Sequence, residues 1–350
     1  MKQIPRDPFR FDLFKLLAKH GHDNNSDLAN PSTLASFIQT VKESISKSLA
    51  NDILRYGLHT EAMFSSMVLS IGSVKLLKHE DASDVYSEIE GINVPDFRLV
   101  LSDDSHVFVE VKNYYQGNDP FKQFTMNIEY LDGLIHYAHI MGARLLIAVF
   151  WAKLGLWTLV QPSAFKVIRN RYELSFVDAY SQNEMVILGD QHIGTKYPLR
   201  TIFYGEKISS QLSGNTEDVL VRITNVKLFC SDHELIDKNE ISIAMYFMLY
   251  GKWIEREPIW NDDGHSISIE HIFEPEEYLN QGFEFIGSLS QMFAKYYVHA
   301  TTSDGVVNDL FTNVSPGELG KLIPDDYKSK SLPLWRISQY PSKIGTTPGS

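Results

Sequence analysis

Two apolar segments separated by a short polar turn constrain the fold of this chain more than any other feature. Residues 97–101 (FRLVL) and 107–111 (VFVEV) are rich in the branched and aromatic side chains that favour extended strands. The four residues Ser102 to Ser105 (SDDS) contain only side chains that are typical of turns. The sequence therefore predicts a β-hairpin over residues 97–111.

Further elements surround this hairpin, because helical spacing of apolar residues predicts helices and short apolar runs predict strands. The helices are predicted at residues 32–49, 51–70 and 120–141. The additional strands are predicted at residues 73–77, 145–151 and 156–161. From residue 51 onward the order is thus helix, strand, hairpin, helix, strand, strand.

The pattern changes to shorter elements after about residue 170. A strand, a helix, a strand and a helix are predicted at residues 219–229, 241–250, 266–273 and 283–299. At roughly 150 residues per domain, a chain of 350 residues is long enough for two domains, and 43% hydrophobic residues suffice for two packed cores. We therefore predict a second, α+β domain after the first.

The predicted organisation has four parts. They are a helical lead-in at 1–50, a core at 51–170, a C-terminal α+β domain of unknown role at 171–340 and a flexible tail at 341–350. The tail is rich in Pro, Gly, Ser and Thr, which are typical of mobile chain ends.

Cysteine content and hydropathy indicate the cellular setting. The one cysteine, Cys230, excludes an intrachain disulfide framework and a cysteine-rich zinc site. Charged residues interrupt the apolar residues between Met1 and Lys19, and the longest apolar run, Leu145 to Ala152, has 8 residues. A membrane helix needs about 20 such residues. We predict a cytoplasmic protein that does not enter a membrane.

The pattern that points to chemistry is Pro95-Asp96, then 13 intervening residues, then Glu110-Val111-Lys112. Strand residues alternate between faces, so Glu110 and Lys112 share one face and Val111 lies on the other. Mg²⁺ is usually held by one or two protein carboxylates together with water. Two carboxylates and a lysine in one small site suit the hydrolysis of a phosphodiester bond.

An ordinary Glu–Lys pair on the polar face of a hairpin is the alternative explanation. The triplet of an acid, any residue and lysine occurs twice in the chain, and the second copy is Asp326-Tyr327-Lys328. That copy lies in a polar stretch without a strand pattern. Only Glu110-Val111-Lys112 lies in an alternating apolar strand, so its context favours the functional interpretation.

The runs Gly91 to Val100 (GINVPDFRLV) and Phe108 to Lys112 (FVEVK), within this order of elements, resemble the PD-(D/E)xK nucleases. The resemblance covers residues 50–165. It implies a restriction-endonuclease-like α/β core, with a central mixed sheet flanked by helices, and Mg²⁺- or Mn²⁺-dependent cleavage of DNA. It also implies that Asp96, Glu110 and the Val111 carbonyl bind the metal and that Lys112 is the catalytic lysine.

The same resemblance suggests two further site residues. Glu61 matches the glutamate that many members carry on the helix before the first core strand, although a solvated helical glutamate is the alternative. Gln123 matches a polar residue on the helix after the lysine strand, where Asn127 and Tyr130 follow on the same flank. A helix surface with ordinary polar residues explains Gln123 equally well.

The hairpin register makes this hypothesis testable. A two-residue turn at Asp103-Asp104 would place Asp96 opposite Val111 and turn its side chain away from Glu110. A three-residue turn at Ser102 to Asp104 pairs Asp96 with Glu110, so that both carboxylates share a face. We predict the three-residue turn.

Charge is distributed unevenly along the chain. The formal net charge is -12, of which residues 1–170 contribute -2 and residues 171–350 contribute -10. The segment 232–284 alone carries 13 acids and 3 bases. This acidic segment is not expected to face DNA. We predict that it contacts a basic protein partner or repels DNA, with a merely solvated acidic face as the alternative.

The predicted function is a divalent-metal-dependent DNA endonuclease, in prokaryotic restriction or anti-phage defence. A recombination or repair nuclease acting on branched DNA and a non-catalytic, nuclease-like scaffold that binds a protein partner are the alternatives. Cutting both strands of a duplex asks for two active sites, which predicts a homo-oligomer.

Overall fold

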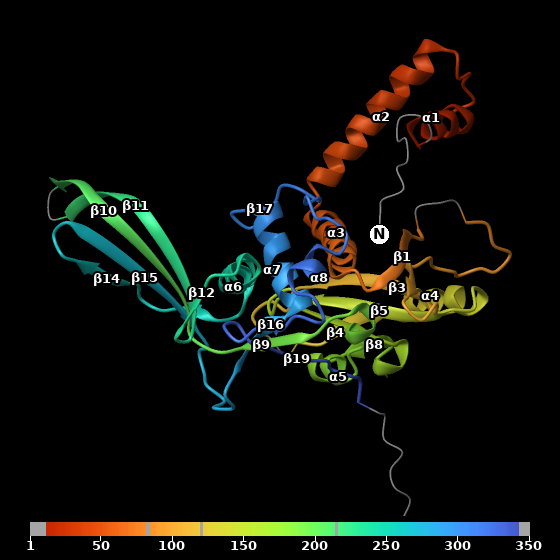
Figure 1. Cartoon of the computed structure of the whole chain (residues 1–350). Coiled ribbons are helices and arrows are strands. Elements are labelled where there is room, and N and C mark those ends of the chain that lie inside the picture. Colours follow the sequence, from red (N-terminus) through yellow and green to blue (C-terminus); the bar gives the residue numbers. More distant parts are fainter. Residues whose placement is uncertain (1–11, 82–84, 120–121, 214–215, 343–350) are drawn as a thin grey trace, which may run out of the picture.

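The computed structural model describes residues 12–81, 85–119, 122–213 and 216–342. The predicted flexible tail, 341–350, lies almost wholly outside these ranges. The described chain is a mixed α/β structure with two projections that stand apart from a central body (Figure 1). No helix in the described ranges combines the length and hydropathy that crossing a membrane requires.

The central body is built around a five-stranded mixed sheet. Its strands are β1 (Val74–His79), β2 (Phe97–Leu101), β3 (His106–Tyr114), β5 (Arg144–Trp151) and β6 (Leu156–Val160), in the order β1-β2-β3-β5-β6. β3 and β5 are parallel, and the other neighbours are antiparallel. The predicted strands and the predicted mixed sheet are confirmed here.

Helices cover both faces of this sheet. α3 (Asp52–Ile71) packs on the face that carries Val109 and Val111, and α4 (Ile128–Ile140) packs on the face that carries Phe108. α3 begins at Asn51, whose side chain accepts the Leu54 N–H, and ends at Gly72 in the left-handed region. The alternation of β3 thus separates two apolar cores, one on each side of the strand.

The register of the hairpin is the predicted one. Phe97 pairs with Val109 and Val100 pairs with His106, so the turn comprises the three residues Ser102, Asp103 and Asp104. Asp104 has a φ of 67°, the left-handed conformation that closes a three-residue hairpin turn. Asp96, one residue before Phe97, therefore lies opposite Glu110.

The predicted helix at 120–141 is wrong in its first part. Residues Phe124–Asn127 form strand β4, which pairs with β8 (Arg171–Leu174), and β8 also pairs with β7 (Lys166–Ile168). The helix begins only at Ile128, because the Asn127 side chain caps it by accepting the Glu129 N–H at 2.8 Å. The β4–β8 pair also joins the chain before residue 170 to the chain after it.

The second half of the chain wraps around the body before it projects. β9 (His192–Thr195) lies between β16 (Glu284–Ser288) and β19 (Leu334–Ile337), and α5 (Phe176–Ser181) and α8 (Glu318–Leu322) are short. α6 (Lys238–Tyr250) and α7 (Leu289–Thr301) contribute to the same apolar core as α3. The predicted helix at 283–299 is wrong in its first part, since β16 precedes α7 and Ser288 caps it.

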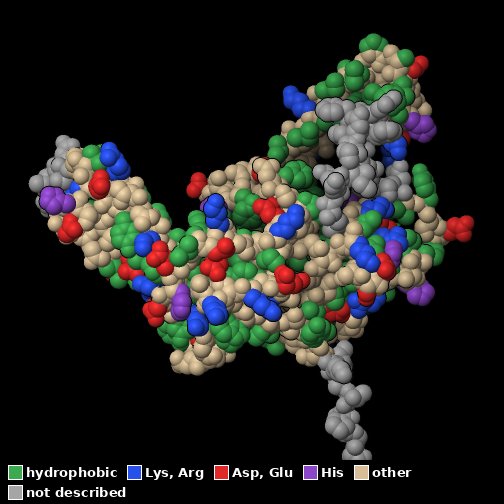
Figure 2. All heavy atoms as spheres, viewed as in Figure 1, with side chains coloured by type: hydrophobic (Ala, Val, Ile, Leu, Met, Phe, Trp, Pro, Cys, Tyr) green, Lys and Arg blue, Asp and Glu red, His purple; other side chains and the backbone are tan. Residues whose placement is uncertain are grey.

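One projection is a β-sheet arm, and the other is helical. The arm contains β10 (Leu199–Ser213), β11 (Thr216–Cys230), β14 (Ile259–Asp262) and β15 (Ser266–Glu274), with β12 (His233–Leu235) and β13 (Ile254–Glu255) at its base. The other projection consists of α1 (Asp12–Asp23) and α2 (Pro31–Leu49). Figure 2 shows a broad hollow between the two projections.

Candidate active site

Asp96 enters the site from the segment that precedes β2. Its Oδ2 atom accepts the Val111 N–H at 2.7 Å, and its carbonyl accepts the Glu80 N–H at 2.9 Å. The preceding loop is held against α4, because the Asn93 side chain donates to the Tyr130 carbonyl at 3.3 Å. A Cβ at Gly133 would lie 2.2 Å from the Asn93 amide nitrogen, so only glycine allows this close approach.

Glu110 is fully buried in the middle of the site. Its Oε1 atom accepts hydrogen bonds from the Lys112 ammonium and, at 2.5 Å, from the Tyr130 hydroxyl. Its Oε2 atom is buried and has no hydrogen-bond partner among the described residues. A buried carboxylate oxygen without a donor is costly, so this atom indicates a place for a ligand.

Lys112 and Tyr130 complete this cluster. The Lys112 Nζ atom lies 3.5 Å from the Tyr130 hydroxyl oxygen and 5.0 Å from the centre of the Tyr130 ring. Burial alone would lower the pKa of Lys112, but the adjacent Glu110 carboxylate outweighs it and raises the pKa above its usual range. The lysine is therefore an ammonium ion throughout the physiological pH range.

The pKa values of two further carboxyl groups are raised, in part by the charges of this cluster. Burial, and then the charge of Glu110, raise the pKa of Asp96 to about 8. Burial also raises the pKa of Glu61 on α3, and the charges of Asp81 and Glu110 add to this effect. Since Glu110 and Lys112 both influence Glu61, the fold brings all four predicted carboxylate and lysine residues of the site into one electrostatic environment.

These groups do not form a preformed metal site with three protein ligands. Across the part of the chain that the structure describes, no group of three or more His, Cys, Asp or Glu side chains is arranged to hold a metal ion. Asp96 and Glu110 face each other, whereas Glu61 is only near them. A two-carboxylate site fits Mg²⁺, which keeps several waters, better than it fits a metal that needs a full set of protein ligands.

Gln123 does not have the predicted place. It precedes β4 instead of lying on a helix, its side chain is exposed, and its carbonyl accepts the Tyr114 hydroxyl at 2.8 Å. The residue that reaches the site from this part of the chain is Tyr130. Its position seven residues after Gln123 was visible in the sequence, but the cap at Asn127 that orients it was not predicted.

Glu80 is a supporting residue that the sequence analysis missed. It is buried at the end of β1, where its carboxylate accepts the Tyr137 hydroxyl at 2.8 Å and the Lys78 ammonium at 3.0 Å. Its N–H also holds the Asp96 carbonyl. Glu80 thus fixes the backbone of Asp96. No local pattern marks this role, because Tyr137 and Asp96 lie far from Glu80 in the sequence.

Comparisons with known proteins give little beyond this geometry. Neither a known protein family nor a curated protein matches the sequence. Among solved structures, part of the chain is similar to a Holliday junction resolvase from Archaeoglobus fulgidus. That similarity covers 29% of this chain and 76% of the resolvase, at 13% identity and a TM-score of 0.23. The functional proposal therefore rests on the geometry of the site.

Proposed function

We propose that this protein is a divalent-metal-dependent phosphodiesterase. The observation that carries this proposal is the Glu110 carboxylate, which is fully buried and bonded to the Lys112 ammonium through one oxygen. Its other oxygen has no partner in the part of the chain that the structure describes. Asp96 lies opposite it in the hairpin. Within this class we propose a PD-(D/E)xK DNA endonuclease, as the motif in the sequence implies.

The metal ligands in this proposal are Asp96, Glu110 and the Val111 carbonyl, with Glu61 near them. The N–H and C=O groups of one strand residue point to the same side of the strand. The Val111 N–H binds Asp96, so the Val111 carbonyl faces the side on which Asp96 lies. A bound Mg²⁺ or Mn²⁺ ion would lower the pKa of a water ligand and neutralise phosphoryl charge.

Lys112 and Tyr130 have separate roles in this proposal. Since Lys112 stays protonated, we assign it to the stabilisation of negative charge on the phosphoryl oxygens rather than to proton abstraction. Tyr130 holds Glu110 and Lys112 in place through its hydroxyl group and ring. The substitution Lys112→Ala removes the charge and leaves the strand intact.

The test is a cleavage assay with the full chain and Mg²⁺, Mn²⁺ or a chelator. Supercoiled plasmid, linear duplex, single strands and four-way DNA junctions are the substrates. We expect metal-dependent cleavage that falls by about 100-fold or more in Lys112→Ala and in Asp96→Ala. Lys321→Ala, which changes an exposed lysine on α8, is the matched control and should cleave like the wild type.

The substrates in this assay also separate the alternatives. Preference for the junction would favour the recombination or repair function over restriction or defence. The absence of metal-dependent cleavage on every substrate would contradict the nuclease proposal and favour the non-catalytic scaffold. The predicted homo-oligomer is measured on the same sample by light scattering.

A further inference from the structure

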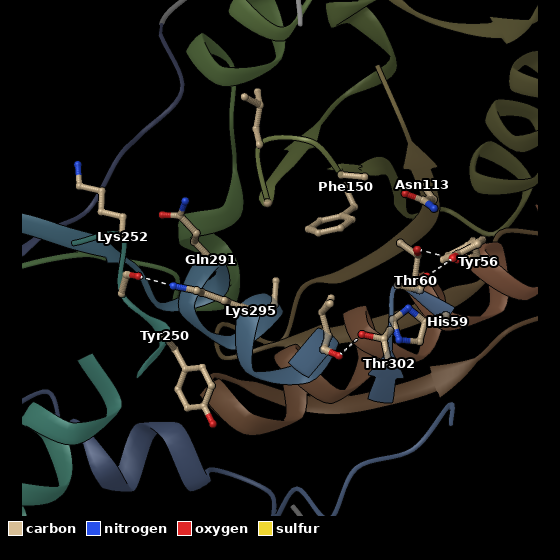
Figure 3. A pocket seen from close by; sticks show the side chains of 17 residues that line it. Tyr56, His59, Thr60, Asn113, Phe150, Tyr250, Lys252, Gln291, Lys295 and Thr302 are labelled. Carbon is tan, nitrogen blue, oxygen red and sulfur yellow. Dashed lines mark hydrogen bonds between the residues drawn. The ribbon is translucent and has the colours of Figure 1, made fainter. Parts of the chain in front are cut away.

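A cavity of about 480 Å³ lies between the central body and the second half of the chain (Figure 3). α3 contributes one wall, the ends of β3 and β5 contribute a second, and the end of α6 together with α7 contributes the third. The residues that matter for its chemistry are Thr60, Asn113, Phe150, Lys252, Gln291 and Lys295. Its size falls within the range of about 300–1,000 Å³ that small-molecule sites occupy.

The lining is positively charged. Its described residues include Lys252 and Lys295 and no Asp or Glu. The Lys295 ammonium donates to the Gly251 carbonyl at 2.9 Å, and burial lowers the pKa of this lysine. Neither lysine forms an ion pair with a residue in the described ranges. Two ammonium groups without carboxylate partners favour an anionic ligand.

The rest of the lining is mainly apolar, and one of its buried polar atoms lacks a partner among the described residues. Phe150 and Val298 line it, and Figure 3 shows the Phe150 ring directed into the space between α3 and α7. The Asn113 Oδ1 atom is buried and has no hydrogen-bond partner among the described residues. Apolar walls with a few convergent polar groups are typical of a site for an organic molecule rather than for a free inorganic ion.

We propose that this cavity binds a nucleotide unit, with its phosphate at Lys295 and Lys252 and its base against the apolar wall that Phe150 and Val298 form. Ammonium groups bind phosphate oxygens, apolar walls cover the faces of a base, and an amide such as Asn113 bonds the edge of a base. The same chemistry occurs in a free nucleotide and in an unpaired nucleotide of a DNA strand. The experiment below distinguishes these two sources.

The cavity is separate from the candidate active site but adjoins it. Asn113 follows Lys112 on β3 and points to the opposite face of the sheet, and Thr60 precedes Glu61 on α3. The proposed nucleotide therefore contacts the same strand and the same helix that hold the site, without touching the site itself. Nucleotide binding here does not depend on cleavage.

The test is calorimetric titration of the full chain in a metal chelator, so that no DNA is cleaved. The probes are the four 5′-mononucleotides, adenosine, inorganic phosphate and a short single-stranded oligonucleotide. We expect saturable binding of a mononucleotide or the oligonucleotide, weakened about tenfold or more by Lys295→Gln. Lys321→Gln should bind like the wild type.

Two more variants keep the result interpretable if Lys295→Gln does not fold. Lys252→Gln changes an exposed side chain, and Val298→Trp adds bulk at a partly exposed position of the lining. Both should weaken binding. Mononucleotide binding identifies the free nucleotide as the source, and binding of the oligonucleotide alone identifies the strand. Equal binding of adenosine and its monophosphate, unchanged binding by all three variants, or no binding by the folded wild type would overturn the proposal.

Discussion

The core sheet and the sheet of the projecting arm differ in how much of their surface is covered. In β5 of the core every residue after Arg144 is buried, because helices pack on both faces of the sheet. In β14 of the arm all four residues are exposed. The comparison shows that a buried charge such as Glu110 requires a sheet that is covered on both faces. In such a sheet a small number of hydrogen bonds determine which groups the carboxylate contacts.

One face of the arm exposes a row of apolar side chains. In the core sheet, helices cover such side chains. Val226, Phe203, Ile269 and Trp260 are paired directly across four neighbouring strands, so they share one face. The exposed fractions are 42% for Val226 and 64% for Trp260. α6 contacts the base of this face, where the Thr201 hydroxyl lies 3.4 Å from the Met248 sulfur. The outer arm therefore contributes little to the apolar core.

The two sheets also differ in how exposed their charged side chains are. Acids of the segment 232–284 form ion pairs with bases of β10 and β11, as in Arg200–Glu270 at 2.8 Å and Lys227–Glu234 at 3.0 Å. Part of the acidity that led us to predict a basic partner is thus balanced within the arm. Such partly exposed pairs contribute little to stability, whereas the buried Glu110 depends on its partners.

The comparison is tested most strongly by one substitution made in each sheet. Ile147 on β5 is fully buried, and Ile223 on β11 is 48% exposed. We expect Ile147→Ala to lower the free energy of unfolding by about 2–5 kcal/mol, because it leaves a cavity in a closed core. Ile223→Ala should lower it by about 0.5 kcal/mol or less. Chemical denaturation followed by tryptophan fluorescence measures both, and equal losses would contradict the comparison.

An effect of similar size is expected from the titration of Asp96. Its pKa is about 8 in the folded protein and about 4 in an unfolded chain, so the folded state holds a proton that the unfolded state releases. The stability of the metal-free protein should therefore fall as the pH rises from about 4 to about 8. Asp96→Asn cannot titrate, and an asparagine oxygen can still accept the Val111 N–H.

We expect the melting temperature of Asp96→Asn to exceed that of the wild type by more at pH 8 than at pH 5, in a chelator. Addition of Mg²⁺ at pH 8 should stabilise the wild type and leave the variant unchanged. Asp103→Asn, on the exposed hairpin turn, is the matched control and should show neither difference. A difference in melting temperature that is independent of pH would show that Asp96 is not the titrating group.

The sequence predicts those parts of the fold that local patterns determine. The strands of the core sheet, the helices α2 and α3 and the three-residue turn follow from alternation, helical spacing and turn chemistry. The hairpin pattern pointed to Asp96, Glu110 and Lys112, and the resemblance to the PD-(D/E)xK nucleases added Glu61. The fold places these four near one another. Their roles as metal ligands and as the catalytic lysine stay predictions.

The errors have non-local causes. Phe124 to Asn127 has apolar residues at helical spacing, but it pairs with β8, a strand more than 40 residues later in the chain. β10 was not predicted, because its extended shape is determined by pairing with β11 and β15 on its two edges. Glu80 and Tyr130 enter the site through contacts with distant segments, which no local pattern records.

The smallest effect is expected from shortening the arm. Glu206 and Arg222 pair directly, so residues 207–221 can be replaced by Asn-Gly, the two-residue turn that suits an antiparallel pair. Because none of the described residues of the excised segment belongs to the apolar core, we expect the melting temperature to change by less than about 2 °C. Metal-dependent cleavage and nucleotide binding should also be unchanged. A large loss of stability would mean that the arm supports the body, and a loss of cleavage alone would assign the arm to substrate binding instead.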